Sequence, residues 1–270
     1  MIHVPKFLKR VRPLNRWATS LLSRYARWTK GRFLVQRRDN LTFLIDQQNA
    51  IDKRMLINGE WEEKQLSTLR QMIACQKQKP EEKVFLDIGA HGALYAMKMA
   101  QSGMFSRVIA FEADAVNAAQ LKANLFLNDL VNKIEVVEAA VSDKDGQAPL
   151  HIPENYYRGG SRIDLDGNLN RISHTKSVNT IALDSCFTFE GLTVVAKIDV
   201  EGHEHQVIRG MQKLLRRNTW LIQIESFDKK YAETHRLLSE AGLVKVGAVE
   251  YDHYFSSPEL VRIESEIGSL

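Results

Sequence analysis

From residue 81 onward, short apolar runs alternate with segments of helical period. The runs KVFLDIG, RVIAFEA, KIEVVEAAVS, LTVVAKIDV and TWLIQIES are typical of buried strands. Helices are expected at residues 93–101, 114–128, 203–216 and 230–240, the second of them capped by Asp114. Strands that alternate with helices form a parallel sheet covered on both faces, which predicts the α/β class.

The last run, LVKVGAVEYDHYFSS, splits near residues 249–252 into two neighbouring strands without a helix between them. The pattern therefore predicts a domain at residues 81–256 whose sheet is mostly parallel, with an antiparallel last strand. The helix after Asp114 is predicted to present one apolar stripe, made of Val116, Ala119, Ala123, Phe126 and Leu130.

The first 40 residues differ from the rest in charge. They hold eleven of the 37 Lys and Arg residues but one of the 33 Asp and Glu residues. Within them, residues 13–31 repeat apolar side chains at three- and four-residue spacings, between Pro13 and Gly31. We expect residues 1–40 to be a basic amphipathic helical leader. Residues 13–31 would lie on an anionic membrane surface, or pack on the domain or on a second subunit. Nucleic acid is the weaker alternative, because no further motif supports it.

The remaining segments and the cysteines complete the organisation. Residues 41–80 are expected to form a helical segment that packs on the domain, and residues 257–270 a C-terminal tail. Two cysteines, Cys75 and Cys186, give neither a disulfide framework nor a metal-ligand spacing. Without an apolar run of membrane-spanning length or a signal core, a cytoplasmic location is expected, at the inner face of the membrane if the leader binds lipid.

Every predicted parallel strand ends in an acid. In such sheets ligands bind beyond the carboxyl ends of the strands, where the strand order reverses. Five acidic strand ends in series favour a cationic or hydroxyl-rich ligand. These ends are Asp87 with Gly89, Glu112, Glu138 with Ala139, Asp199 with Glu201, and Glu225.

Glu112 follows Asp87 by 25 residues, which is where a nucleotide-binding sheet grips ribose hydroxyls. Nicotinamide dinucleotides and S-adenosylmethionine both fit such a clamp. The turn at residues 89–93 lacks the G-x-G-x-x-G fingerprint of a pyrophosphate site, and Asp87 would repel a pyrophosphate. The ammonium group of S-adenosylmethionine would instead be attracted to the Asp87 carboxylate. S-adenosylmethionine is therefore preferred, with a nicotinamide-dependent oxidoreductase as the alternative.

The chain resembles a known family in five stretches. The stretches FLDIGAHGALY, VIAFEADAVNAAQLKANLFLND, IEVVEAAVSDKDG, TIALDS and AKIDVEGHEHQVIRGMQKLL are together similar to the FkbM-type S-adenosylmethionine-dependent methyltransferases. The resemblance covers about residues 55–250. It implies a Rossmann-like class I methyltransferase sheet.

The resemblance also implies a set of cofactor-binding residues. They are Asp87, Gly89, Ala90 and His91 in the D-x-G-A-N-x-G loop, Glu112 and Ala113 in the F-E-x motif, and Glu138, Ala139 and Ala140 against the adenine. Two positions depart from the pattern. His91 replaces the usual Asn, and Ala93 replaces the last glycine, so a methyl group would crowd a turn that needs a positive φ angle.

The chemistry implied is methyl transfer to an oxygen, commonly a hydroxyl of a sugar-type or glycan acceptor. Because a hydroxyl is a poor nucleophile, a general base should assist it. Asp199 is the first candidate, with Glu201 and Glu225 as further catalytic candidates, and Lys197 would orient Asp199. No metal is expected, since His203 and His205 read as residues of the first helical turn.

Residues 156–180 interrupt the alternation and are rich in Gly, Ser, Tyr and Asn. A loop of this length in a compact domain is usually functional, so a substrate flap is predicted. Arg158, Arg162 and His174 are its candidate substrate contacts, the arginines for an anionic group. A further alternative is a non-catalytic relative in which Ala93 spoils the loop and the leader binds a membrane or a partner.

Overall fold

The structure is a computed structural model that describes residues 31–49, 51–53, 62–76, 79, 82–153, 160–163, 172–226 and 228–260. The predicted helix of the leader, Arg158 and most of the C-terminal tail lie outside these residues. None of the helices in the described ranges is long and apolar enough to span a membrane.

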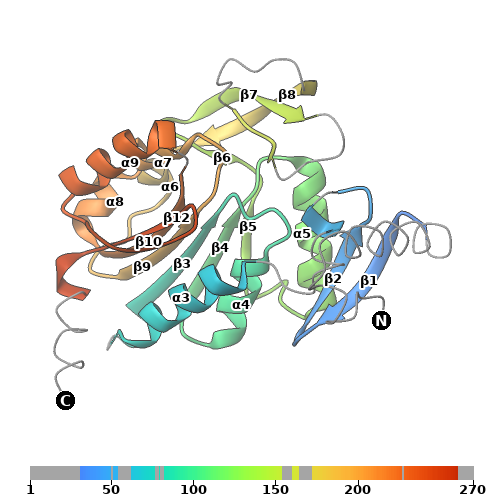
Figure 1. The fold of residues 1–270 in the computed structure, drawn as a ribbon, viewed down its shortest axis with the longest axis horizontal. Coiled ribbons are helices and arrows are strands. Elements are labelled where there is room, and N and C mark those ends of the chain that lie inside the picture. The colour runs from blue at the N-terminus through green and yellow to red at the C-terminus, as the bar shows by residue number, and fades with distance from the viewer. Residues whose placement is uncertain are drawn as a thin grey trace, which may run out of the picture.

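A seven-stranded sheet forms the centre of the molecule, in the order β11-β12-β10-β9-β3-β4-β5 (Figure 1). All neighbours are parallel except β12, which runs antiparallel to β10 and β11. The strand bounds are β3 Lys83–Ile88, β4 Arg107–Phe111, β5 Glu135–Val137, β9 Thr193–Ile198, β10 Thr219–Glu225, β11 Val244–Val249 and β12 Asp252–Ser256. The predicted α/β class, the parallel sheet and the antiparallel last strand are confirmed. The strand order reverses between β3 and β9.

Helices cover both faces of this sheet, as strands buried on both sides require. They are α3 Glu63–Ala74, α4 Leu94–Ser102, α5 Ala115–Leu127, α6 Leu183–Cys186, α7 Glu204–Arg209, α8 Gln212–Arg217 and α9 Asp228–Glu240. Phe85 packs with α3, α4 and α5, whereas its neighbour Leu86 packs with the opposite layer of α6 to α9. Both side chains are fully buried, so β3 lies at the middle of two hydrophobic cores.

The helix predicted at residues 203–216 is two helices, α7 and α8, joined at Gly210. At Gly210 the backbone passes very close to the backbone of Ser142. A Cβ atom on Gly210 would lie 1.9 Å from the carbonyl oxygen of Ser142. This contact interrupts an otherwise regular helical period.

A small second sheet stands above the main one, with the order β6-β8-β7 (Figure 1). It is built from β6 Ala140–Val141, β7 Gly146–Pro153 and β8 Ile172–Ile181. The predicted third strand is therefore wrong as a single element, because the chain leaves the main sheet after Val137 and enters the small one at Ala140. The predicted flap is also shorter than expected, since residues 172–180 belong to β8.

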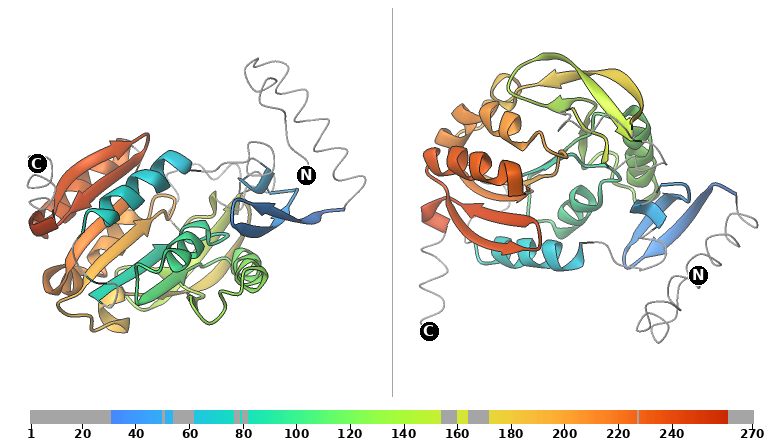
Figure 2. Two further views of the ribbon diagram at one scale, coloured as in Figure 1. Left: turned by 90° about the horizontal axis from the view of Figure 1, so that it is seen from below. Right: turned by 45° about the horizontal axis from the view of Figure 1, so that its top comes forward.

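An N-terminal hairpin lies beside α5, as the views in Figures 1 and 2 agree. It consists of β1 Phe33–Arg38 and β2 Leu41–Asp46. These strands correct the helical expectation for the end of the 1–40 leader and the start of the 41–80 segment, while α3 confirms a helix later in that segment. Leu41, Phe43 and Ile45 alternate into the core, a period-2 pattern too short to identify reliably from sequence.

Side-chain amides of α5 replace the missing neighbour strand of β2. Gln120, Asn124 and Asn128 recur every four residues and so share one helix face. Asn128 accepts from the Thr42 N–H at 2.8 Å and donates to the Thr42 carbonyl at 2.7 Å. Asn124 accepts from the Leu44 N–H at 2.7 Å, and Gln120 donates to the Leu44 carbonyl at 2.8 Å. The edge of β2 is thereby satisfied without a strand.

This amide face makes the predicted apolar stripe of α5 wrong at Val116 and Phe126, whereas Leu130, which follows the helix, is buried in the core as predicted. The buried face is Asn117, Ala118, Leu121, Asn124 and Leu125. Val116 is 39% exposed and Phe126 is 75% exposed. The prediction chose the outer face because it considered apolar residues only. It did not consider that side-chain amides can be buried where they bind the edge of a strand. Asp114 does cap the helix, accepting from the Val116 N–H at 2.8 Å.

Replacing Asn128 by Ala is expected to lower the free energy of unfolding by about 1–3 kcal/mol, because the N–H and carbonyl of Thr42 lose their partner. Phe126→Ala, on the same helix, is the matched control and should stay within about 0.5 kcal/mol. Urea denaturation of the two variants checks this. A larger loss for Phe126→Ala would restore the apolar stripe as the buried face.

Candidate active site

A cavity of about 670 Å³ opens at the carboxyl ends of the central strands, where their order reverses. Its floor comes from the ends of β3, β4, β9 and β10. The hairpin, α5, the start of α3, the small sheet and the turn between β11 and β12 supply its walls. A cavity of this size accommodates a small-molecule ligand, which makes it the candidate active site.

The loop after β3 is held against two strand ends. The N–H groups of Gly89 and Ala90 donate to the Phe111 carbonyl at 3.0 and 2.9 Å. Gly89 has a φ angle of +84°, and a Cβ atom there would lie 1.8 Å from the carbonyl oxygen of Asp199. Glycine is therefore required at this position by both conformation and space.

His91 and Ala93 continue the loop in the left-handed region, with φ angles of 46° and 65°. Ala93 stands where the family pattern has its last glycine. The turn has a positive φ angle at this position, as expected. A non-glycine residue in this region costs about 1–2 kcal/mol. The methyl group of Ala93 is fully buried.

Glu112 ends β4 and bridges two parts of the site. Its Oε2 accepts from the His91 N–H and its Oε1 from the Asp114 N–H, both at 2.8 Å. Asn117 also bonds this carboxylate, and because a carboxylate has about four lone-pair sites, Glu112 keeps acceptor capacity for a ligand. Burial raises the pKa of Glu112 to about 7, against the lowering effect of these hydrogen bonds.

Asp87 has a structural partner as well as a place in the cavity wall. Its Oδ2 accepts from the Ala96 N–H at 2.9 Å, which satisfies a free donor in the first turn of α4. Burial raises the pKa of Asp87 to about 6, and the charge of Lys197 opposes that rise. The acid at the mouth of the glycine turn thus anchors the following helix.

The other predicted cofactor residues divide into two groups. Gly89, Ala90, His91, Ala113, Ala139 and Ala140 line the cavity with Asp87 and Glu112. Glu138 is not among the lining residues; it pairs with Lys122 on α5, and both side chains are about half exposed.

The ends of β9 and β10 hold a buried charge network. Lys197 Nζ lies 2.6 Å from Asp199 Oδ2 and 3.8 Å from Glu62 Oε2. Asp199 also shares a hydrogen bond with Glu225. Burial, followed by the charge of Asp199, raises the pKa of Glu225 to about 9. Burial opposes ionisation of Asp199, but Lys197 and the Glu225 hydrogen bond hold the Asp199 pKa below its usual value. At neutral pH the pair is therefore one carboxylate and one carboxylic acid.

Two more acids complete this end of the cavity. Burial, then the charge of Asp199, raises the pKa of Glu201 to about 7, while Arg162 opposes that shift. Asp252 accepts from Gln223 Nε2 at 2.7 Å, and burial raises its pKa to about 6. Arg162 lines the cavity as predicted, through the segment whose backbone pairs with His151. His174 does not line it, since it lies exposed on β8.

Sequence reasoning missed several residues of this site. Tyr95 lies under Lys197, whose Nζ is 5.0 Å from the ring centroid, and accepts from Gln223 at 2.9 Å. Its spacing in α4 gave no signal beyond an apolar helix face. Three further acids line the cavity but do not lie at the carboxyl ends of the predicted parallel strands, namely Glu62, Asp52 and Asp252. Within the described ranges, no group of three or more His, Cys, Asp and Glu residues has the geometry to hold a metal ion.

Comparison with protein families decides the class. The profile of the methyltransferase FkbM domain matches residues 87–245. The chain belongs to the FkbM methyltransferase family. This membership confirms the predicted family, the enzyme class and S-adenosylmethionine as the cofactor, and it decides against a nicotinamide oxidoreductase. Among curated proteins, no relative matches the chain significantly.

Solved structures similar to this FkbM methyltransferase include other methyltransferases. The N-terminal domain of human METTL16 in complex with SAH is 13% identical over 72% of this chain and 68% of that one, with a TM-score of 0.41. Human methyltransferase 10 domain containing protein is 13% identical over 90% and 96%, with a TM-score of 0.46. Precorrin-6y C5,15-methyltransferase from Geobacter metallireducens GS-15 is 12% identical over 70% and 85%, with a TM-score of 0.42.

The raised pKa values predict an unusual dependence of stability on pH. Asp87 and Asp252 titrate at about 6 and Glu112 and Glu201 at about 7 in the folded chain, above the usual value near 4. Burial raises the pKa of Glu225 further, to about 9. The folded state therefore binds more protons than the unfolded state, and stability falls as pH rises from about 4 to about 9. The melting temperature should be higher at pH 5 than at pH 8. Glu112→Gln should reduce that difference, and a melting temperature that rises over this range would contradict the account.

Proposed function

We propose that this FkbM methyltransferase transfers a methyl group to a hydroxyl oxygen of a neutral, sugar-type acceptor, with the Asp199 carboxylate receiving the hydroxyl proton. The observation that carries the proposal is the Lys197–Asp199–Glu225 arrangement at the carboxyl ends of β9 and β10. It lies in the same cavity as the loop after β3, so the methyl donor and the acceptor would meet beside it.

The residues of the cavity fit S-adenosylmethionine. Glu112 keeps acceptor positions for ribose hydroxyls, and Asp87 offers a carboxylate toward the ammonium group. Small side chains leave room for a flat base, namely Ala113, Ala139 and Ala140. When bound, the cofactor supplies an electrophilic methyl group. The chain supplies alignment and exclusion of water, which account for most of the rate in a displacement of this kind.

Asp199 is suited to accept a proton because its environment keeps it ionised. Lys197 is 4% exposed and donates to Asp199 at 2.6 Å, which fixes the carboxylate in position. Glu225, as the neutral member of the pair, donates a hydrogen bond to Asp199. A positioned base of this kind contributes about 10²–10⁴-fold to a reaction rate.

The charge of the acceptor end favours a neutral, hydroxyl-rich molecule. Glu201, Glu225 and Asp252 line it together with Asp199, and all can accept hydrogen bonds from hydroxyls when ionised. The positive charge of Arg162 already interacts with Glu201 and opposes the rise of its pKa, so this charge is shared between Glu201 and any anionic group of an acceptor. Tyr251, 56% exposed, adds an aromatic ring at the same end.

Incubation of the full chain with trideuteromethyl-labelled S-adenosylmethionine and a panel of neutral, amino and acidic sugars tests the function. Mass spectrometry is expected to find the label on an oxygen of a neutral sugar. Asp199→Asn should then lower kcat for that acceptor by about 10²–10⁴-fold and change cofactor affinity by less than about twofold. Full activity of Asp199→Asn would remove it as the base.

The pH profile separates Asp199 from its neighbours. If Asp199 is the base, kcat is flat through about pH 7 and falls as Glu225 loses its proton at about pH 9. Glu225→Gln, which still donates a hydrogen bond, should abolish that alkaline fall. A kcat that rises through about pH 7 in the parent chain, where Glu201 and Glu112 both ionise, and no longer rises in Glu201→Gln would instead identify Glu201 as the base.

A further inference from the structure

The hairpin and the turn after it lie outside the residues that the family profile matches, yet they line the cavity. Phe43, Leu44, Ile45, Ile51 and Asp52 all contribute to the wall. The turn is well packed, since Asp46, Asn49 and Asp52 are 5%, 1% and 2% exposed. A segment before the matched domain therefore lines the same cavity.

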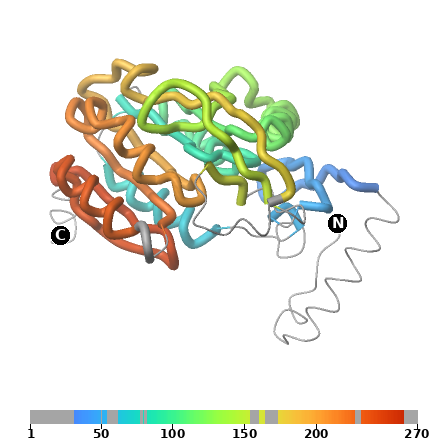
Figure 3. Tube along the Cα trace, turned by 90° about the horizontal axis from the view of Figure 1, so that it is seen from above, coloured from blue at the N-terminus to red at the C-terminus, as the bar shows by residue number. Residues whose placement is uncertain are grey.

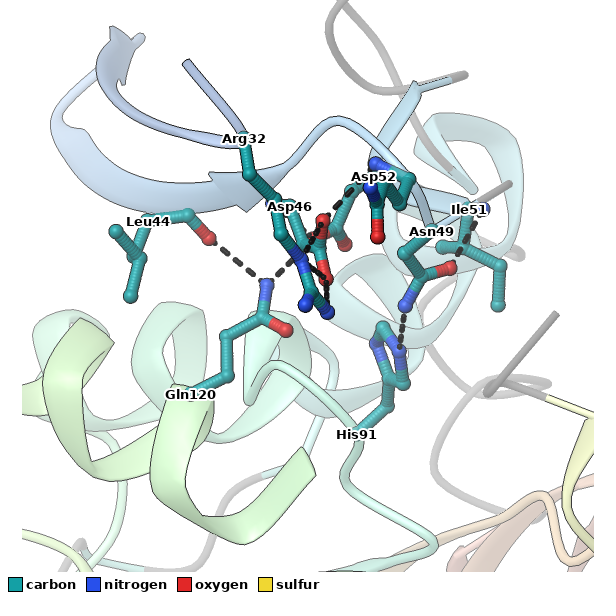
Figure 4. A network of polar contacts seen from close by, with 9 residues as sticks. Arg32, Leu44, Asp46, Asn49, Ile51, Asp52, His91 and Gln120 are labelled. Carbon is teal, nitrogen blue, oxygen red and sulfur yellow. Dashed lines mark hydrogen bonds and ion pairs between the residues drawn. The ribbon is translucent and has the colours of Figure 1, made fainter. Parts of the chain in front are cut away.

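Hydrogen bonds fix this segment to the cofactor loop. Asn49 Nδ2 lies 3.2 Å from His91 Nε2 (Figure 4). Asn124 of α5 bonds both sides, accepting from the Leu44 N–H and donating to the Gly92 carbonyl at 2.9 Å. The hairpin, α5 and the cofactor loop thus form one hydrogen-bonded unit.

Asp52 occupies a distinctive place in this unit. Its Oδ2 accepts both from the Asp46 N–H at 2.8 Å and from Gln120 Nε2 at 2.6 Å (Figure 4). No donor among the described residues bonds its Oδ1, although the side chain lines the cavity. One oxygen therefore holds the fold, and the other is available to a ligand.

His91 lies near both Asp52 and Glu112. The His91 N–H donates to Glu112, while the His91 ring contacts Asn49. Burial raises the pKa of Asp52, and the nearby His91 opposes that rise. Asn117 and Gln120 lie one turn apart on α5 and connect the same two acids, through hydrogen bonds to Glu112 and Asp52 respectively. Both acids line the cavity, Glu112 from the end of β4 and Asp52 from the N-terminal segment, so a ligand above His91 would meet two carboxyl groups.

We propose that Asp52 is a second ribose-binding carboxylate, so that the cofactor ribose is held between Glu112 of β4 and Asp52 of the N-terminal segment. This rests on the proposed use of S-adenosylmethionine at the same cavity. A ribose diol has two hydroxyl donors, which matches one free acceptor on each side. The N-terminal segment is then a specificity element for the nucleoside and not only a cover.

The test is titration calorimetry of the full chain with S-adenosylhomocysteine and with its 2′-deoxy and 3′-deoxy analogues. Asp52→Asn keeps an oxygen for the Asp46 N–H and Gln120 but replaces the free oxygen by an NH₂ group. It is expected to weaken S-adenosylhomocysteine binding about 10- to 100-fold, the range of a hydrogen bond to a charged group. With one of the two deoxy analogues, the same substitution should cause no further loss.

Asp46→Asn is the matched control. It makes the same chemical change in the same turn, but Asp46 pairs with Arg32 at 2.6 Å and does not line the cavity. Its affinity for S-adenosylhomocysteine should stay within about twofold of the parent. If Asp52→Asn melts below the titration temperature, the comparison of all variants is repeated at a lower temperature at which Asp52→Asn is folded.

The outcomes separate the two proposals. Equal losses for all three ligands would make Asp52 purely structural, and no loss at all would remove it from the site; either result overturns this inference while cofactor binding stands. A parent chain that binds no S-adenosylhomocysteine would overturn the proposed function itself, favour the non-catalytic relative, and remove the basis of this inference.

Discussion

The backbone contact between Gly89 and Asp199 is the constraint on which the site depends. Gly89 leaves no room for a side chain, and the Asp199 N–H donates to the Ile88 carbonyl at 2.9 Å. The loop after β3 and the end of β9 are therefore in direct contact at the point where strand order reverses. Because this contact is made by backbone, a methyl donor held by the loop and the proposed base, Asp199, would keep a fixed separation that side-chain motion does not alter.

The second requirement is a means of burying several acids together. Lys197 supplies the opposite charge for Asp199 and Glu62, and Glu225 stays protonated and bonds its ionised neighbour. Gln223, fully buried, ties Asp252 to Tyr95. Such a network is stable only while its members are partnered. Burial raises the pKa of Glu225 to about 9 and that of Asp252 to about 6, so the contribution of these two acids to stability weakens as the pH rises.

The sequence predicted the parts of this molecule that depend on local pattern. Buried runs that alternate with helices identified the sheet and its antiparallel last strand, and the acids at strand ends identified Asp87, Glu112, Asp199, Glu201 and Glu225 as residues of one cavity. The predictions failed where a distant contact overrides the local pattern. The outward turn at Glu138, the Gly210–Ser142 contact and the amides of α5 that bind β2 leave no periodic signal. Asp52 was missed for the same reason, since only the fold brings it to His91.

In the view of Figure 3 the N-terminal hairpin, in blue, lies beside the rest of the described chain. The central claim is that the N-terminal segment and the methyltransferase domain form a single cofactor site, because both line the same cavity. Hydrogen–deuterium exchange of the full chain, with and without S-adenosylhomocysteine, tests it most directly. The account predicts that the ligand protects the amides of residues 42–53 together with those of the loop at residues 89–93. Protection confined to the loop and the strand ends, with residues 42–53 unchanged, would contradict it.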